Sequence, residues 1–333
     1  MVLALVLLVA GALLLVGAAL TLARVTTPGG RWGVGLVAMV PWGVPAFVLA
    51  LVGFGAAMWL GGGRPVRLPA VIALAGLVVQ LVWLAPAYLG SHPAGPGNLT
   101  VMQLNMRYGV ADPRATTALA ERSGADVVAL EEATPESAAN LRAQGLQQRL
   151  PHRAGLVGEG KGGVEVLSRY PLTRVRRLGV IAGAFVMRVH APRPFWLVVV
   201  HADQPFDDPG LWEHDLAVVR SVAAHLRGPR IVVGDLNATL GHAPVRRLLD
   251  TGLADAAQTS NSGWQPTWPG AEGGFPPLPR FGLVQIDHVL VGGGVAAVST
   301  RTTEIPGTDH RAVVAHLVVG RGRPGSAPAG AVP

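Results

Sequence analysis

The stretch RIVVGDLNAT at residues 230–239 is the clearest indication of the fold. Its apolar run is typical of a buried strand and ends abruptly in Asp235 and Asn237. Four other apolar runs end in the same way, and GTDHR at residues 307–311 leads into another: LTVMQLN (99–105), ADVVALEE (125–132), FWLVVVH (195–201) and VQIDH (284–288). Since a rigid sheet can bring the ends of several strands to one place, the series predicts a polar site at one end of a β-sheet.

Helical patterns alternate with these strands, which indicates an α/β domain. Strands are predicted at 99–105, 126–132, 163–168, 185–191, 195–201, 230–235, 286–291 and 312–318. Helices are predicted at 113–123, 135–147, 209–227 and 242–250. Residues 260–281 are rich in Pro, Gly and Trp and form a long loop, and long loops in compact domains are often functional.

The first 90 residues hold three long apolar runs, at 3–23, 37–60 and 69–89, and none of them contains Asp, Glu, Lys or Arg. Each run matches the ~20 apolar residues that a helix needs to cross a bilayer core. A cleaved signal peptide is the alternative for the first run, but no Lys or Arg precedes it. We therefore predict a membrane region with three retained transmembrane helices.

The remaining chain divides by composition. Residues 91–98 are predicted to be a linker, residues 99–319 the catalytic domain and residues 320–333 a disordered tail. The loops at 24–32 and 61–67 carry two Arg each. With the terminal amine, the N-terminal side of the membrane has a small positive excess. The prediction is a multi-pass protein of the cell membrane whose catalytic domain lies outside the cytoplasm.

The charge balance, 27 Lys and Arg against 20 Asp and Glu, looks like a nucleic-acid signal. Six of the basic residues flank the catalytic region instead: Arg24, Arg31, Arg64, Arg67, Arg321 and Arg323. The catalytic region is therefore nearly neutral, which argues against tight non-specific binding of nucleic acid. The chain has no Cys, and this excludes disulfides, zinc–thiolate sites and thiol nucleophiles.

The residue types at the strand ends fit phosphoryl chemistry. Glu132 and Asp309 supply the oxygen ligands that hard divalent cations prefer. Asp235 is placed to take the proton of an attacking water. His310 can protonate or stabilise a phosphate oxygen if a carboxylate such as Asp287 holds its ring.

The ordered series LNMR, ALEE, LSRYP, VVVH, GDLNAT, IDHVL and GTDHR resembles the endonuclease/exonuclease/phosphatase (DNase I-like) superfamily over residues 99–318. The resemblance implies a four-layer α/β sandwich of two packed mixed β-sheets flanked by helices, here preceded by the three-helix transmembrane region. It also implies Mg²⁺ or Mn²⁺ as cofactor and in-line attack of water on phosphorus.

Motif positions assign the roles that the resemblance implies. The catalytic residues would be Asp235, Asn237, His310, His201 and Asp287, and the metal-site residues Glu132, Asn105 and Asp309. Asn105 would touch either the metal or the phosphate. Two weaker candidates for binding the substrate are Arg169, which otherwise braces a loop, and Trp268, which otherwise pins the long loop.

The chain departs from the family pattern at two positions. Glu131 stands where the family often has Gln, and strand alternation predicts that only one of Glu131 and Glu132 points inward. Motif position favours Glu132 as the metal ligand. Glu165 stands where a small or apolar residue is usual, and it is either an exposed edge residue or a carboxylate that orients His201.

Together these features predict a membrane-anchored, metal-dependent phosphoesterase that hydrolyses a phosphodiester or phosphomonoester, with a lipid headgroup as one candidate substrate. Its partners would be the phosphate-ester substrate and the lipid bilayer, with no obligate protein partner. One alternative is a membrane-bound nuclease acting on DNA or RNA. An alternative of another class is a catalytically inactive membrane receptor or scaffold, although every expected position is filled.

Overall fold

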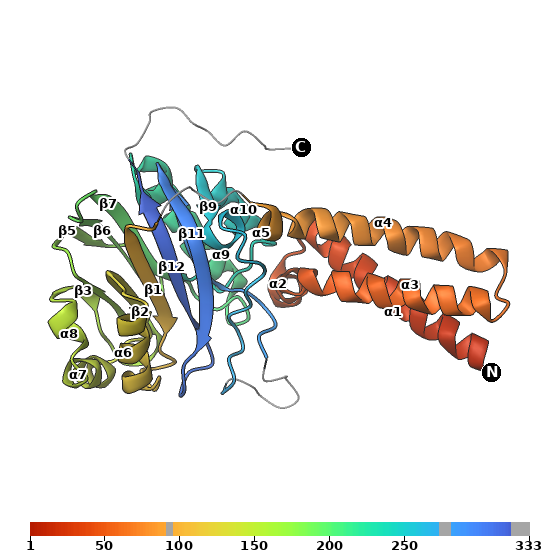
Figure 1. The fold of residues 1–333 in the computed structure, drawn as a ribbon, viewed down its shortest axis with the longest axis horizontal. Helices are drawn as coiled ribbons and strands as arrows, with labels where there is room; N and C mark the ends of the chain where they lie inside the picture. Colours follow the sequence, from red (N-terminus) through yellow and green to blue (C-terminus); the bar gives the residue numbers. More distant parts are fainter. Residues whose placement is uncertain (91–95, 273–280, 321–333) are drawn as a thin grey trace. The chain divides into compact units, whose positions relative to one another are not determined.

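The computed structural model describes residues 1–90, 96–272 and 281–320, and the chain divides into two compact units, Met1–Pro86 and Ala87–Pro333 (Figure 1). Parts of three predicted segments lie outside the described residues: the linker at 91–98, the loop at 260–281 and the tail from 320.

The first unit is helical, as its uninterrupted apolar sequence predicts. Its elements are α1 (Val2–Thr26), α2 (Gly30–Ala38), the 3-10 turn η1 (Val40–Trp42), α3 (Gly43–Trp59), the 3-10 turn η2 (Arg64–Val66) and α4 (Arg67–Leu84). Three segments are long and apolar enough to cross a membrane, namely Val2–Thr26, Val40–Trp59 and Arg64–Leu84. Between 11% and 39% of their residues are buried within the structure, so most of their apolar side chains face outward.

Small residues allow the three long helices to pack closely. The ring of Phe47 on α3 lies against Gly17 of α1 and Gly76 of α4, where a Cβ would meet the ring. Gln80 is buried in the same unit, and its Nε2 donates to Thr21 Oγ1 at 2.9 Å. Close glycine contacts and one interhelical hydrogen bond are the usual means of holding helices together in an apolar solvent.

The second unit contains two six-stranded sheets. The first has the order β11 (Val295–Glu304), β12 (Arg311–Val319), β1 (Leu99–Asn105), β2 (Val127–Glu131), β4 (Val164–Ser168) and β3 (His152–Leu156). The second has the order β5 (Leu172–Arg177), β6 (Gly183–Val189), β7 (Phe195–His201), β8 (Arg230–Asp235), β10 (Asp287–Gly292) and β9 (Leu253–Asp255). Both sheets are mixed, because β1 pairs with β2 and β7 with β8 in parallel and the other pairs are antiparallel.

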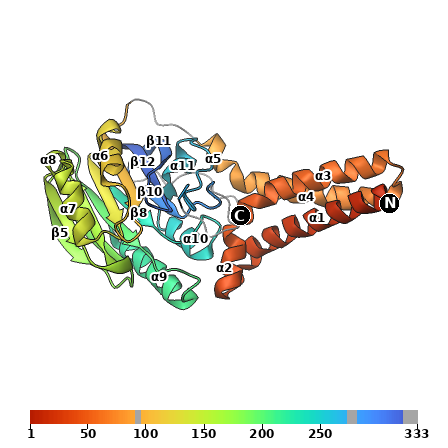
Figure 2. The same cartoon turned by 90° about the horizontal axis from the view of Figure 1, so that it is seen from below.

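Helices cover the outer faces of the two sheets (Figures 1 and 2). The first sheet packs on α6 (Pro113–Arg122), α7 (Pro135–Ala143) and α8 (Leu146–Arg149). The second sheet packs on α9 (Pro209–His225), which contacts α10 (Ala243–Leu249). The unit also contains two short helices, α5 (Pro86–Leu89) and α11 (Ala256–Thr259), and the 3-10 turn η3 (Gly160–Gly162). The predicted four-layer α/β sandwich is thereby confirmed.

Strand alternation positions the polar residues. Leu99 and Val101 of β1 and Ile231 and Val233 of β8 fill the space between the sheets. Since side chains two residues apart share a face, each inward-facing row continues to the last residue of its strand. At the carboxyl ends of β1, β2, β7 and β8 these rows finish with Asn105, Glu131, His201 and Asp235. We call this end of the sandwich the site end.

Candidate active site

Asp235 lies at the centre of the site end, with only 1% of its surface exposed. Asn105 donates its Nδ2 to Asp235 Oδ2 at 3.1 Å, and the backbone N–H of Asn237 donates to Oδ1 at 2.8 Å. The Nε2 atoms of His201 and His310 each lie 3.8 Å from Asp235 Oδ2. The structure therefore brings together five of the predicted residues, from three strands and two loops.

His310 is held by a second carboxylate. Its Nδ1 donates to Asp287 Oδ2 at 2.9 Å, and Thr308 Oγ1 accepts from the His310 backbone N–H at 3.1 Å. Burial lowers the pKa of His310, but the negative charges of Asp287 and Asp235 outweigh it and raise the pKa to about 10. The ring is thus a cation at neutral pH and can donate from Nε2.

The pKa values of Asp235 and Asp287 are shifted in opposite directions, although both carboxyls are buried. Burial and the charge of Asp287 raise the pKa of Asp235 to about 6. Burial also opposes ionisation of Asp287, but the charge of His310 and hydrogen bonds to His310, Thr267 and Gln103 hold the Asp287 pKa below its usual value. A carboxylate with a pKa near 6 is ionised at neutral pH yet basic enough to accept a proton.

Glu131 and Glu132 both face the site, so the prediction that alternation lets only one point inward is wrong. Glu131 is the last residue of β2, and alternation turns it between the sheets. Glu132 follows the strand with φ = 52°, a left-handed conformation that breaks the alternation. Its Oε1 accepts from Asn105 Nδ2 at 3.2 Å and its Oε2 from the Tyr108 backbone N–H at 2.7 Å.

Gln103 is a site residue that the sequence analysis missed. Its Nε2 donates to Glu131 Oε2 at 2.8 Å and to Asp287 Oδ1 at 2.7 Å, so it connects the two sheets beneath the site. Burial raises the Glu131 pKa well above its ordinary value, in spite of this hydrogen bond. The sequence pattern could have identified Gln103, because Gln103 and Asn105 occupy successive inward positions of one strand.

Backbone contacts fix the orientation of His201 and Asn237. His201 Nδ1 donates to the carbonyl of Lys161 at 2.9 Å, which leaves Nε2 facing Glu132 Oε1 at 3.7 Å and Asp235. Asn237 has φ = 47°, and its Nδ2 donates to the Ala202 carbonyl at 2.9 Å. This directs the amide oxygen of Asn237 to act as an acceptor.

Asp309 and Trp268 lie together at the border of the site. Trp268 Nε1 donates to Asp309 Oδ2 at 3.2 Å, and Arg107 Nε lies 3.8 Å from Asp309 Oδ1. The carboxylate of Asp309 is about a quarter exposed, whereas Asp235, Asp287 and Glu132 are buried. Trp268 thus belongs to the site through Asp309.

Arg169 is not brought to the site. It pairs with Asp126 at 2.9 Å, at the other end of β2 from Glu131, because Ser168 is opposite Val127 and Val164 is opposite Glu131. At about 3.3 Å per residue, the length of the strand separates Arg169 from the site. A side chain paired there has a structural role.

Both predictions for Glu165, an exposed edge residue or a carboxylate that orients His201, are wrong. It is 3% exposed, so it is not an exposed edge residue, and it forms an ion pair with Arg153 of β3. Alternation places Glu165 on the face opposite to Val164 and Val166, which fill the space between the sheets. It therefore does not orient His201, whose Nδ1 is already taken by Lys161.

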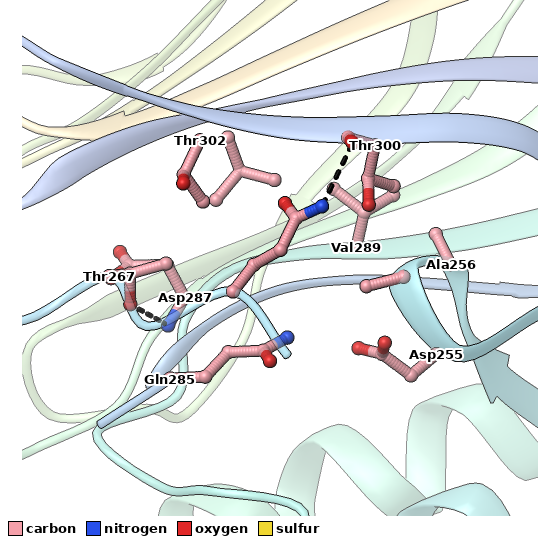
Figure 3. Close-up of a pocket in the computed structure, with 11 residues that line it drawn as sticks. Asp255, Ala256, Thr267, Gln285, Asp287, Val289, Thr300 and Thr302 are labelled. Carbon is pink, nitrogen blue, oxygen red and sulfur yellow. Dashed lines mark hydrogen bonds between the residues drawn. The ribbon is translucent and has the colours of Figure 1, made fainter. Parts of the chain in front are cut away.

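A small cavity of about 10 Å³ lies beside Asp287 in the interior (Figure 3). Thr267 Oγ1 accepts from the Asp287 backbone N–H at 3.1 Å, and Gln265 Nε2 donates to the Thr300 carbonyl at 2.9 Å. The cavity has room for about one water molecule, and although most of its lining residues carry polar groups, the surface that they turn to it is mostly apolar. The polar support of Asp287 therefore comes from its hydrogen bonds with His310, Thr267 and Gln103.

Glu132 and Asp235 both accept hydrogen bonds from Asn105 Nδ2, so their carboxylates lie close together. Two neighbouring carboxylates suit a small divalent cation, which prefers oxygen ligands. Asp235, Asp287 and His310 also have potential ligand atoms within 4.8 Å of one another. Both oxygens of Asp287 in that group already accept hydrogen bonds, from His310 at 2.9 Å and from Gln103 at 2.7 Å, so we favour the pair of Glu132 and Asp235. Asn105 turns its amide nitrogen inward and its oxygen to the Arg107 N–H at 2.9 Å, which disfavours its predicted role as a metal ligand.

Residues 102–310 match the sequence model of the Endonuclease/Exonuclease/phosphatase family. The matched segment covers more than half of the chain and contains every residue of the site described above. No curated protein sequence matches the chain.

Solved structures show the same fold at low identity. A protein of this family from Beutenbergia cavernae is 20% identical, with a TM-score of 0.51 over 68% of this chain and 73% of that one. D. rerio TDP2 in complex with a single-strand DNA product is 14% identical, with a TM-score of 0.56 over 66% of this chain and 98% of that one. A mannosyl-6-phosphatase from Bacteroides thetaiotaomicron is 14% identical, with a TM-score of 0.51 over 66% of this chain and 100% of that one.

Proposed function

The chain belongs to the endonuclease/exonuclease/phosphatase family, and from this premise we propose that it is a membrane-anchored, metal-dependent phosphoesterase. The observation that carries the proposal is the surroundings of Asp235. A buried carboxylate with a pKa of about 6 faces two histidines and two asparagines at the end of a rigid sandwich. This combination of a base and several donors suits the hydrolysis of a phosphate ester.

In the proposed reaction Asp235 takes a proton from water, while the amide oxygen of Asn237 orients that water. The water oxygen bonds to phosphorus as the ester P–O bond breaks, the leaving alkoxide takes a proton from solvent water, and Asp235 later releases its proton to solvent. His310, held by Asp287, donates to a phosphate oxygen as negative charge develops there. His201 offers Nε2 as a further contact to the phosphate.

We propose that Glu132 is the main ligand of a Mg²⁺ or Mn²⁺ ion, with Asp309 as a second acid of the metal site. A bound divalent cation would supply charge neutralisation and polarise a phosphate oxygen. Asn105 then acts as a hydrogen-bond donor that keeps the carboxylates of Glu132 and Asp235 together or contacts the phosphate.

The proposal is tested with the full chain in detergent, using bis(p-nitrophenyl) phosphate with Mg²⁺ or with EDTA. We expect EDTA to abolish hydrolysis, and Asp235→Asn and Glu132→Gln to lower kcat by roughly 10²–10⁴-fold. Asp250→Asn is the matched control, because Asp250 is an exposed carboxylate at the carboxyl end of α10. Wild-type rates in Asp235→Asn would overturn the role given to Asp235, whereas a chain inactive toward phosphodiesters and phosphomonoesters alike would favour the receptor or scaffold alternative.

We further propose that the candidate spans in α1, α3 and α4 anchor the protein in a membrane, with the catalytic unit outside the cytoplasm. The support is the length and hydropathy of these helices together with the small excess of positive charge on the N-terminal side. Reporters fused to the C-terminus decide the orientation. An alkaline phosphatase fusion should be active and a green fluorescent protein fusion dark, whereas the reverse result places the catalytic unit in the cytoplasm.

A further inference from the structure

Exposed apolar side chains gather at the site end of the sandwich. Among the described residues from Leu99 onward, the large apolar side chains that are strongly exposed are Tyr108, Val110, Leu156, Val175, Ile181, Phe206, Leu211 and Phe281. All of them except Val175 belong to loops or element ends at the site end. Single exposed apolar residues are ordinary on a protein surface, but their concentration at one end is informative.

The topology places these residues around the active site. Tyr108 and Val110 follow β1 directly after Asn105, and Phe206 follows β7 after His201. Ile181 lies in the loop between β5 and β6, next to Gly183, which pairs with His201. Leu156 ends β3 opposite Val164, which in turn is opposite Glu131. Exposed fractions run from 50% to 59% for these five.

The opposite end of the sandwich has a different surface. In the described residues of its loops, exposed side chains include Arg169, His190, Arg193 and Arg227, and none of the strongly exposed large apolar residues lies there. The comparison shows that the apolar residues are a property of the site end and not of loops in general.

The charges at the site end limit which polyanions or lipid surfaces it can bind. Acidic residues that are not buried outnumber basic ones at the site end outside the catalytic cluster. The acidic residues are Asp112, Glu136, Glu159, Asp207, Asp208, Glu272 and Glu304, and the basic residues are Arg107, Arg114, Lys161, Arg177 and Arg311. An acidic surface repels polyanions such as nucleic acid and disfavours strongly anionic lipids. Aromatic and aliphatic side chains among these charges fit the interfacial region of an uncharged or zwitterionic bilayer.

We propose that the site end docks on a zwitterionic phospholipid surface and that the substrate is the phosphodiester of a membrane lipid. The candidate spans give a reason for this choice of partner, because they keep the catalytic unit beside a bilayer wherever the protein is inserted. The choice of substrate rests on the proposed hydrolase function, whereas the docking does not. Tyr108, Val110, Ile181 and Phe206 form the docking rim, and the ester is cleaved where it meets Asp235.

Labelling at single cysteines tests the docking, and the chain is suited to it because it contains no Cys. Full-length Val110→Cys and Ile181→Cys proteins are labelled with the fluorophore NBD and inserted into phosphatidylcholine nanodiscs. Arg227→Cys, at the opposite end, is the control. Doxyl-labelled phosphatidylcholine should quench the two rim labels at least threefold more than the control. Equal quenching at all three positions, or stronger quenching at Arg227→Cys, overturns the docking.

A comparison of two substrates tests the choice of lipid. The double variant Val110→Ser/Ile181→Ser should hydrolyse vesicle phosphatidylcholine about tenfold more slowly, while its rate on bis(p-nitrophenyl) phosphate stays within twofold of wild type. Val175→Ser is the matched control, because Val175 is equally apolar and 45% exposed but lies in β5 away from the rim. An equal loss on both substrates, or no loss on either, overturns the inference.

The two failures are distinguishable. If the wild-type chain cleaves no phosphate ester, the proposed hydrolase function fails, and the NBD measurement still decides whether the site end docks. If it cleaves bis(p-nitrophenyl) phosphate but not phosphatidylcholine while the rim labels are quenched, the docking stands and the lipid substrate is wrong.

Discussion

The two units of the chain treat buried polar groups in opposite ways. In Met1–Pro86 the buried polar residue is Gln80, and Thr21 satisfies it with a single hydrogen bond. In Ala87–Pro333 buried carboxyls and imidazoles contact one another across the two sheets, as in the chain of hydrogen bonds from Glu131 through Gln103 and Asp287 to His310. The first unit is apolar outside, and the second concentrates charge inside.

Removing the same type of buried polar residue therefore costs a different amount of stability in each unit. Removing one partner from a buried network of hydrogen bonds and charges leaves the other groups unsatisfied, which is expensive. In a bilayer a polar side chain also finds hydrogen-bond partners when the helices are separated, so a single interhelical hydrogen bond contributes little. The predictions below test this contrast.

The largest effect is expected at His288, which is buried behind the catalytic loop. Its Nδ1 donates to Asp255 Oδ2 at 3.1 Å and its Nε2 to the Ala238 carbonyl at 2.8 Å, so both nitrogens are protonated. His288→Leu leaves the buried Asp255 carboxylate without a charged partner, with only the Gln258 backbone N–H still donating to it, and should lower the free energy of unfolding by about 3–5 kcal/mol. The double variant His288→Leu/Asp255→Leu should recover much of this loss in thermal unfolding monitored by tryptophan fluorescence.

The same pair predicts a pH dependence with a definite sign. Burial lowers the His288 pKa, but the hydrogen bond and charge of Asp255 outweigh it and raise the pKa above its ordinary value. The stabilisation is therefore complete below the unfolded pKa of about 6.5 and is lost as the pH rises through the folded pKa. The difference in Tm between wild type and the double variant should shrink with rising pH; a constant difference would mean that His288 is neutral when folded.

The next effect is expected in activity, at Gln103. Gln103→Leu removes the donor that reaches both Glu131 and Asp287, so Asp287 holds His310 less firmly. We expect kcat to fall by about 10–100-fold with little change in KM, as for other groups that orient a reacting residue. Glu131→Gln is the comparison, because it keeps an acceptor for Gln103 and should stay within a few-fold of wild type. Full activity in Gln103→Leu would show that the link is not needed.

The strands that the sequence analysis missed reveal what a local pattern can predict. All eight predicted strands are present, and β1, β7 and β8 match their predicted bounds. The four missed strands are the ones at the edges of the two sheets, namely β3, β5, β9 and β11. Edge strands have one unpaired side and carry charges that discourage association, as LTRVRR in β5 shows, so they lack the apolar pattern of central strands.

The helix prediction at 135–147 failed at a local break, and the site predictions failed where the outcome depends on distant partners. The helix predicted at 135–147 is divided into α7 and α8 at Gly145, whose φ of 88° ends the first helix. Arg169 and Glu165 are paired with Asp126 and Arg153, which strand register alone brings beside them. The polar residues at central strand ends were predictable because alternation and strand length fix both their position and their direction.

In the helical unit the largest effect is expected from overpacking. Gly76→Val places a side chain where the ring of Phe47 lies, and we expect a loss of about 1–3 kcal/mol of stability. Gly55→Val is the matched control, because no heavy atom lies within 4 Å of a Cβ at that position. Unfolding of the full chain by SDS, followed by circular dichroism, measures both. Equal midpoints for the two variants would show that the contact of Phe47 with Gly76 does not hold the helices together.

The smallest effect is expected at Gln80, where the change matches the one at Gln103. Gln80→Leu removes the hydrogen bond to Thr21 Oγ1, but that hydroxyl still donates to the Gly17 carbonyl at 2.8 Å. Gln80 contacts no charged group, so the free energy of unfolding in SDS should fall by only about 0.6 kcal/mol. The activity should be unchanged. One substitution, Gln to Leu, thus probes both units. If Gln80→Leu were to cost as much as Gly76→Val, the helical unit would also depend on its polar contact, and the contrast between the two units would fail.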